Sequence, residues 1–216
     1  KAPWTPEPFL TTIMITGGWK DADMSRIVAG EARGRRLVVP PGRDTRPTSD
    51  RVREALFSSL QADVGALEGL RFLDLYAGSG AVGLEALSRG AAAVVLVEGN
   101  RRSADVIRQN LRTVGLPGGR LLSGKVESLL AGPAPGGKPF DVAFLDPPYA
   151  MTAAAVAGVL TRLREHGWLT VDAAVVVERS ARTGAFAWPL GFVADRDRRY
   201  GDTTLWYGRA AEEDRA

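Results

Sequence analysis

Phe140-Asp141-Val142-Ala143-Phe144-Leu145, followed by Asp146-Pro147-Pro148-Tyr149, is the stretch that decides the fold of this chain. The apolar run predicts a buried strand, and the strand must end at the two prolines because proline cannot continue a ladder of backbone hydrogen bonds. In open α/β sheets, ligands bind at the carboxyl ends of the strands. A carboxylate, two rigid residues and an aromatic ring at that end predict a loop that holds a planar amino group. A plain strand-ending turn is the alternative interpretation.

Strands and helices alternate on both sides of this stretch. Alternation of this kind favours a parallel sheet with helices on both faces, and residues 192–194 and 203–207 are typical of a final antiparallel pair. We therefore expect an α/β fold with a doubly wound, mostly parallel, seven-stranded sheet of the Rossmann-like kind. The predicted strands are 72–76, 93–97, 120–123, 140–145 and 173–178, and the predicted helices between them are 81–88, 101–114, 126–130 and 150–165.

The chain ahead of this region divides into two further parts. Residues 1–23 are interpreted as a leader or an upstream extension outside the fold, because Met24 resembles a natural start. Residues 24–47 are expected to form a β-hairpin and loop, with Gly34 supplying a positive φ in the turn, that acts as a separate RNA-binding flap. The main domain is expected over residues 48–209, beginning with a helix capped by Thr48 or Ser49. Residues 210–216 are expected to be a frayed tail.

Positive charge is concentrated near the beginning of the chain. The formal net charge is +3, yet residues 24–53 alone carry an excess of five positive charges, so the rest of the chain is slightly acidic. A local excess of arginine favours an anionic partner such as nucleic acid, with a solvated charged surface as the alternative. The candidate RNA-binding residues are Arg26, Arg33, Arg35, Arg36, Arg43, Arg46, Arg51 and Arg53.

Composition excludes several classes of site. The chain has no cysteine, which rules out disulfides, thiolate metal sites and cysteine nucleophiles, and its single histidine, His166, rules out a histidine metal cluster. We therefore expect no metal. No apolar run has membrane-spanning length and no signal peptide is recognisable, so the sequence predicts a cytoplasmic protein, which we expect to be a monomer.

A glycine-rich loop joins the first two predicted elements of the main domain. Asp74-Leu75-Tyr76-Ala77-Gly78-Ser79-Gly80-Ala81-Val82-Gly83 matches the dinucleotide fingerprint, and Glu98 ends the next strand about 20 residues later, where that fingerprint places an acidic residue. An NAD-dependent oxidoreductase is therefore one hypothesis. Asp74 favours S-adenosylmethionine instead, because a carboxylate there would repel a pyrophosphate and attract the ammonium group of methionine. Asp146-Pro147-Pro148-Tyr149 also has no evident role in hydride transfer.

Residues 74–83 resemble the cofactor loop of class I S-adenosylmethionine-dependent methyltransferases. The tetrapeptide from Asp146 resembles the motif of those that methylate planar nitrogens. Arg26-Ile-Val-Ala-Gly30, Gly34-Arg-Arg-Leu37 and the stretch from Arg46-Pro-Thr-Ser-Asp50 through Arg53-Glu-Ala-Leu-Phe57 resemble the RsmD-type 16S rRNA guanine-N2 methyltransferases. The resemblance implies S-adenosylmethionine as cofactor and 16S rRNA, in the small subunit or an assembly intermediate, as partner. It implies cofactor contacts by Asp74, Tyr76, Ala77, Gly78, Ser79, Gly80, Gly83, Glu98, Glu127 and Asp146, and catalytic roles for Asp146, Pro147 and Tyr149.

The expected chemistry is methyl transfer to the exocyclic N2 of guanine. The Asp146 carboxylate and the Pro147 carbonyl would accept the two amino hydrogens, and Tyr149 would stack on a base that is flipped out or already unpaired. Other hypotheses remain: a DNA adenine-N6 methyltransferase, which would normally need a larger recognition region, and a protein glutamine-N5 methyltransferase, in which asparagine usually replaces the aspartate. The NAD-dependent oxidoreductase and a non-catalytic RNA-binding assembly factor also remain.

Overall fold

The computed structural model describes residues 24–40 and 49–211. The expectations for residues 1–23, for Arg43 and Arg46, and for the tail after Ala211 lie outside these ranges. Within them the predicted fold class is confirmed.

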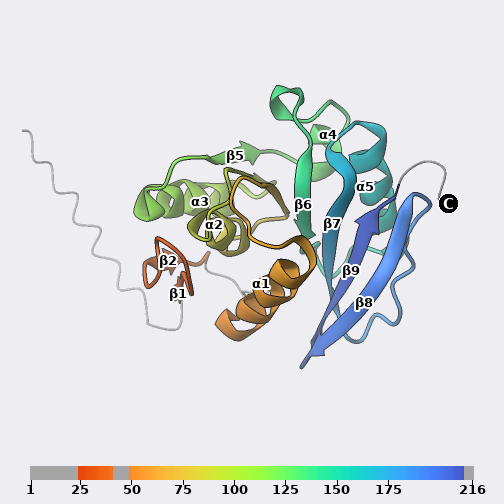
Figure 1. The fold of residues 1–216 in the computed structure, drawn as a ribbon, viewed down its shortest axis with the longest axis horizontal. Helices are drawn as coiled ribbons and strands as arrows, with labels where there is room; N and C mark the ends of the chain where they lie inside the picture. The colour runs from red at the N-terminus through yellow and green to blue at the C-terminus, as the bar shows by residue number, and fades with distance from the viewer. Residues whose placement is uncertain (1–23, 41–48, 212–216) are drawn as a thin grey trace, which may run out of the picture.

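A seven-stranded sheet forms the centre of the molecule, in the order β5-β4-β3-β6-β7-β9-β8 (Figure 1). The first five of these strands run parallel to one another, β9 is antiparallel to β7, and β8 is antiparallel to β9. The strands are β3 (Arg71–Leu75), β4 (Ala93–Glu98), β5 (Gly119–Ser123), β6 (Phe140–Leu145), β7 (Leu169–Ser180), β8 (Phe192–Tyr200) and β9 (Thr203–Ala210).

Helices cover both faces of this sheet. Apolar residues of α1, α2 and α3 form one core with one face of the sheet, whereas those of α4 and α5 form a second core with the other face. The structure is therefore doubly wound, because strands are added on both sides of β3 and right-handed crossovers in opposite directions place their helices on opposite faces. The helices are α1 (Asp50–Val64), α2 (Ala81–Ser88), α3 (Arg101–Val114), α4 (Val126–Leu129) and α5 (Ala153–Glu165), with a short 3₁₀ turn at Pro135–Gly137.

Side-chain caps fix where three of the helices begin. The Ser49 hydroxyl accepts from the Val52 N–H at α1, the Asn100 side chain accepts from two N–H groups at α3, and the Thr152 hydroxyl accepts from the Ala155 N–H at α5. These bonds satisfy amide groups that the first turn of a helix leaves unpaired. Because Thr152 is the cap, α5 begins at Ala153 and not at residue 150 as predicted.

The N-terminal hairpin consists of β1 (Met24–Arg26) and β2 (Arg36–Val38), paired antiparallel. Gly34 has a φ of +83°, as predicted for the turn. The expectation of a separate flap is wrong. Ile27 and Leu37 are fully buried in the same core as residues of α1 and α2, so the hairpin completes that core.

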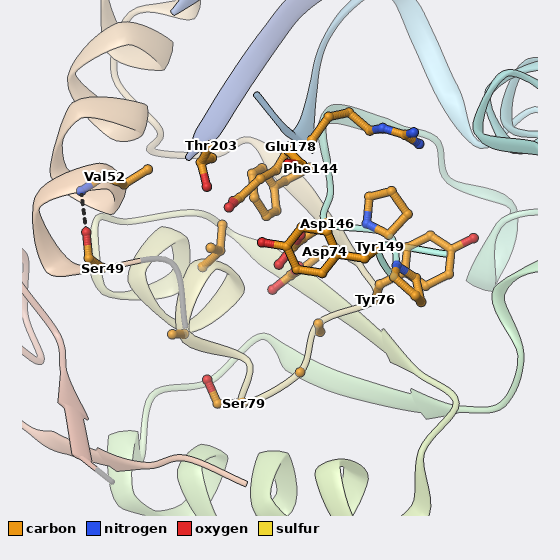
Figure 2. Close-up of a pocket in the computed structure, with 18 of the residues that line it drawn as sticks. Ser49, Val52, Asp74, Tyr76, Ser79, Phe144, Asp146, Tyr149, Glu178 and Thr203 are labelled. Atoms are coloured by element: carbon orange, nitrogen blue, oxygen red, sulfur yellow. Dashed lines mark hydrogen bonds between the residues drawn. The ribbon is translucent and has the colours of Figure 1, made fainter. Parts of the chain in front are cut away.

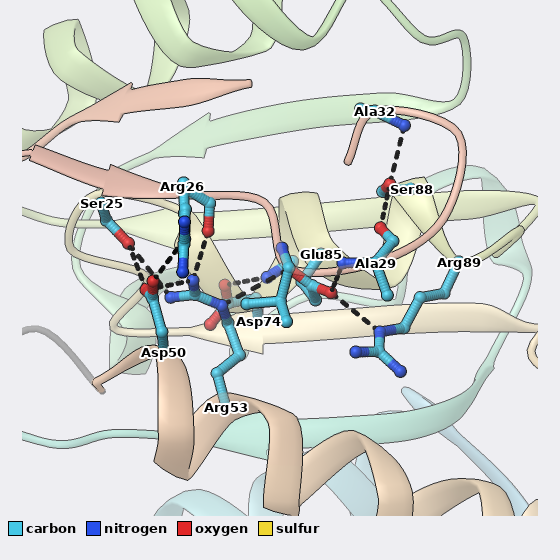
Figure 3. Close-up of polar contacts among 12 residues, drawn as sticks. Ser25, Arg26, Ala29, Ala32, Asp50, Arg53, Asp74, Glu85, Ser88 and Arg89 are labelled. Carbon is cyan, nitrogen blue, oxygen red and sulfur yellow. Dashed lines mark hydrogen bonds and ion pairs between the residues drawn. The ribbon is translucent and has the colours of Figure 1, made fainter. Parts of the chain in front are cut away.

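Buried polar groups attach the hairpin to α1 and α2 (Figure 3). The Glu85 carboxylate on α2 accepts from the backbone N–H groups of Val28 and Ala29 at 2.8 and 2.9 Å. Arg53 on α1 lies 2.9 Å from Asp50 and 3.5 Å from Glu85, and its guanidinium donates to the Arg26 carbonyl. A charge-paired network of this kind orients the three elements relative to one another.

Candidate active site

The glycine loop and the proline-rich loop meet at the topological switch point of the sheet. From β3 the chain passes through α2 to β4 on one side, while β6 pairs with β3 on the other side. The loops after β3 and β6 therefore diverge and leave a crevice at the carboxyl ends of the strands, which is the usual ligand site of such sheets.

Strand register brings three carboxylates to one face of the sheet. Asp74 is paired with Phe144, and Asp146 lies two residues beyond Phe144 on the same face. Phe144 is also paired with Val176, and Glu178 lies two residues beyond Val176. Figure 2 shows Asp74, Asp146 and Glu178 in the same part of the pocket.

A cavity of about 480 Å³ contains most of the predicted site, a size typical of small-molecule and cofactor sites. Predicted residues that line it are Asp74, Tyr76, Ala77, Gly78, Ser79, Glu98, Asp146, Pro147 and Tyr149. Gly80, Gly83 and Glu127 do not line it. Additional lining residues come from the start of α1, the loop before α3 and the hairpin of β8 and β9, among them Ser49, Val52, Asn100, Ser103, Tyr200 and Thr203.

Two glycines of the loop have structural roles. The motif alone fits equally well with glycines that contact the ligand. Gly80 precedes α2 with a φ of +79°, in the left-handed region that favours glycine. A Cβ atom on Gly83 would lie 3.0 Å from Leu96 and Val94 side-chain atoms and 3.1 Å from Asp74 Oδ2. Gly83 thus lets α2 pack closely on β4, and its N–H donates to Asp74 Oδ2 at 2.8 Å.

Carboxylates also order the rest of the glycine loop. Glu98 Oε2 accepts from the Gly78 N–H at 2.8 Å, and Oε1 accepts from the Asn100 N–H at 2.6 Å. Tyr76 adopts a φ of +59°, an uncommon conformation for a residue with a side chain, and its hydroxyl donates to Glu127 Oε1 at 2.9 Å. Glu127 therefore contacts the pocket indirectly, through Tyr76.

Several carboxylates gather in the pocket, among them Asp74, Glu98, Asp146 and Glu178. Burial raises the pKa of Asp74 to about 7, against the lowering effect of the Gly83 N–H, and the charge of Glu98 raises it further. Burial likewise raises the pKa of Asp146 well above its usual range, and the Glu178 and Asp74 carboxylates add to this shift. Negative potential at this position favours a cationic ligand and disfavours a pyrophosphate.

The proline-rich loop is held close to β3. The Asp146 N–H donates to the Leu75 carbonyl at 3.3 Å, and the Met151 N–H donates to the Pro148 carbonyl at 2.8 Å, which closes a turn. Pro147 is buried, whereas the Tyr149 side chain is 63% exposed. A largely exposed ring beside the half-buried Asp146 offers a stacking surface at the pocket mouth.

Comparison with known proteins agrees with this geometry. A family model described as "Conserved hypothetical protein 95" matches residues 25–209. The ribosomal RNA small subunit methyltransferase D of Escherichia coli K12 is 36% identical over 188 residues, which cover 87% of this chain and 91% of that protein. The chain belongs to the ribosomal RNA small subunit methyltransferase D family.

Two further relatives support the assignment. The methyltransferase D of Haemophilus influenzae is 39% identical over 154 residues, covering 71% of this chain and 77% of that protein. A solved structure described as a putative methyltransferase of Escherichia coli superimposes with a TM-score of 0.75 at 34% identity, covering 87% of this chain and 98% of that one.

Not all candidate arginines of this methyltransferase D family member are available to RNA. Arg26, Arg33, Arg35, Arg36 and Arg51 are exposed. Arg35 also donates to the carbonyls of Thr113 and Val114 at the end of α3, so it caps that helix. The prediction for Arg53 is wrong, because its side chain is fully buried among α1, α2 and the hairpin.

The sequence prediction for this methyltransferase D family member missed one carboxylate of the pocket. Glu178 is a buried carboxylate that lines the cavity beside Asp146. The signal was present, because Glu178 follows the apolar run Val175-Val176-Val177 just as Glu98 follows Val94-Val95-Leu96-Val97. An acidic residue at the end of an apolar strand was counted as functional at Glu98 but not here.

In residues 24–40 and 49–211, no group of three or more histidine, cysteine, aspartate or glutamate side chains is arranged to hold a metal ion. Among the same residues no helix is long and apolar enough to cross a membrane.

Proposed function

We propose that this protein transfers the methyl group of S-adenosylmethionine to the exocyclic N2 of a guanine in 16S rRNA. The observation that carries the proposal is the single pocket at the switch point, where the glycine loop after β3 and Asp146-Pro147-Pro148-Tyr149 after β6 face each other. Membership of the methyltransferase D family supports it.

The donor set of the pocket fits S-adenosylmethionine. Its ammonium and sulfonium groups are both cationic, and the Asp74, Glu98 and Asp146 carboxylates line the pocket that would receive them. Asp74 would hold the ammonium group, while Glu98 would use its remaining acceptor capacity for the ribose hydroxyls. When bound, the cofactor supplies a methyl group on a positively charged sulfur.

Asp146 and Pro147 would prepare the nucleophile. The N2 lone pair of guanine is delocalised into the ring, which makes the nitrogen a weak nucleophile. Acceptance of its two hydrogens by the Asp146 carboxylate and the Pro147 carbonyl would favour a pyramidal nitrogen with its lone pair directed away from them. With its lone pair so directed, N2 would accept the methyl group that the cofactor supplies and would lose its proton afterwards. Catalysis by these residues is positioning and electrostatic stabilisation.

The exposed arginines of the hairpin and α1 would bind phosphates of the substrate. Arg33, Arg36 and Arg51 are candidates because they are exposed and lie on elements that border the pocket through Val39 and Ser49. Arg43 and Arg46 belong to the same basic segment. The partner would be 16S rRNA in the small subunit or an assembly intermediate. The protein would therefore act in the cytoplasm. We propose that it acts as a monomer.

The deciding experiment is methyl transfer to small subunits from a strain that lacks this protein. Labelled methyl should appear on one guanine N2 when S-adenosylmethionine is present, and mapping of the modified nucleotide identifies the target. Calorimetry with S-adenosylmethionine and with NADH should show binding of the first only. Label on adenine N6 or on a protein glutamine would support the rival methyltransferases. NADH binding alone would support an oxidoreductase, and RNA binding without methyl transfer would support an assembly factor.

A further inference from the structure

Glu178 is the pocket carboxylate that the proposed mechanism leaves without a role. It follows Val177, and Val177 is paired with Leu145 in the parallel register of β6 and β7. Asp146 and Glu178 are therefore the next residues along two adjacent strands, on the face that also carries Asp74. Glu178 is 8% exposed and lines the cavity together with Asp146 and Pro147.

Acceptors on Asp146, Pro147 and Glu178, which all line the pocket, complement the donors of one nucleobase. The edge of guanine that carries the reactive amino group presents three hydrogens, two on N2 and one on N1. Asp146 and the Pro147 carbonyl account for the two on N2. An ionised carboxylate such as Glu178 accepts hydrogen bonds and donates none, so it complements the adjacent N1–H. Adenine presents a lone pair at N1, which a carboxylate would repel.

We propose that Glu178 selects guanine by accepting the N1–H hydrogen bond while Asp146 and Pro147 hold the neighbouring amino group. This inference rests on the proposed guanine-N2 activity. It assigns the discrimination between guanine and adenine to β7, because the Asp-Pro-Pro-Tyr loop by itself binds an amino group of either base. A buried carboxylate oxygen disfavours a base that presents a lone pair at the same position, because two acceptors that face each other repel.

The first arm of the test uses the unaltered protein. Small subunits are reconstituted with 16S rRNA that carries either guanine or 2-aminopurine at the mapped target position. 2-Aminopurine keeps the 2-amino group but has a lone pair at N1 and no oxygen at C6, so the Glu178→Gln arm below isolates the contribution of N1. Loss of the N1 partner should lower kcat/KM by about 100-fold or more, as at other sites that recognise a substrate N–H. Equal rates on the two substrates would overturn the proposal.

The second arm uses Glu178→Gln, whose side-chain amide can donate to the N1 lone pair. Its preference for guanine over 2-aminopurine should fall by at least about tenfold relative to the unaltered protein. The matched control is Asp172→Asn, which removes an exposed carboxylate from the same strand outside the pocket. Asp172→Asn should keep the original preference. Calorimetry with S-adenosylmethionine shows whether each variant retains a folded cofactor site.

The outcomes separate this inference from the proposed function. If the unaltered protein transfers no methyl to guanine N2, the proposed function fails. If it methylates guanine N2 but Glu178→Gln keeps the original guanine to 2-aminopurine ratio, the function stands and the role of Glu178 is refuted. Should Glu178→Gln fail to fold, equal rates of the unaltered protein on the two bases would still refute the role of Glu178.

Discussion

Asp146 and Glu178 follow the register-paired residues Leu145 and Val177 on adjacent parallel strands, and the Glu178 charge adds to the effect of burial in raising the pKa of Asp146. Two neighbouring carboxylates on one face of a sheet, shielded from solvent, disfavour each other's ionised form. The same proximity lets both reach one planar ligand. This pair links the electrostatics of the pocket to the base that it is proposed to recognise.

The first prediction concerns pH and follows from this pair. Removal of the Glu178 charge should lower the pKa of Asp146, so the ionised form of Asp146 persists to lower pH. The acidic limb of kcat/KM against pH, which reports groups of the free enzyme, should therefore shift to lower pH in Glu178→Gln. Asp172→Asn should leave the limb in place. An unshifted limb in Glu178→Gln would mean that the two carboxylates do not interact.

The second prediction concerns the proline-rich loop. Asp146→Ala should lower kcat for methyl transfer by at least about 100-fold, because an acceptor for the amino group is lost. Its melting temperature should not fall, since the change also removes a charge from a crowded acidic pocket. Tyr149→Ala should lower turnover, whereas Tyr149→Phe should keep most of it if the ring stacks on the base. Full activity of Asp146→Ala would exclude this residue from the chemistry.

The third prediction concerns stability without cofactor. The Asp74 carboxyl group has a pKa of about 7 in the folded chain and 3.8 as its ordinary value. At a pH between these two pKa values, the Asp74 carboxyl group is protonated in the folded protein but has lost its proton in the unfolded chain. The stabilisation is fully present below about pH 4 and is lost as the pH rises through 7.

Asp74→Asn removes this titration while keeping an oxygen that can accept from Gly83. Urea unfolding between pH 5 and pH 8 should show a steeper loss of stability for the unaltered protein than for Asp74→Asn. If the difference in the free energy of unfolding between the two proteins stays constant with pH, the pKa of Asp74 is not raised.

The fourth prediction concerns RNA. Arg33 and Arg36 are exposed on the hairpin, so their joint replacement by alanine should weaken binding of small-subunit RNA and reduce the salt dependence by about 0.7–0.9 per lost phosphate contact. Arg162→Ala, on α5 at the opposite face of the sheet, is the control. Filter binding across a salt series measures both quantities. If the dependence of RNA affinity on salt is unchanged in the double variant, these arginines form a solvated surface and do not contact phosphates.

The fifth prediction compares two arginines of the first turn of α1. Arg53→Ala should lower the free energy of unfolding by about 3–5 kcal/mol, because it leaves the buried Glu85 carboxylate without one of its cationic partners. Arg51 is exposed, so Arg51→Ala should change stability by less than about 0.5 kcal/mol. Urea unfolding of both variants measures the two changes. Similar losses of stability would show that the burial of Arg53 does not make it more important for stability than Arg51.

Local sequence determined the elements and the core of the site. Apolar runs predicted each parallel strand to within a few residues, and Ser49 as a cap fixed the start of α1. Strands β7, β8 and β9 are longer than predicted. Their additional residues are partly polar, so a prediction from apolar runs did not include them. Asp74 and Asp146 could be found because each ends an apolar strand next to a recognisable loop.

Only the tertiary structure decided which distant residues meet. Arg33 and Arg53 lie in one basic segment of the sequence, yet the first is exposed and the second is buried against Glu85 on α2. Glu178 joins Asp146 because β7 pairs with β6 in one particular register. Strand order, register and helix packing depend on contacts between residues far apart in the chain, and local periodicity carries no information about them.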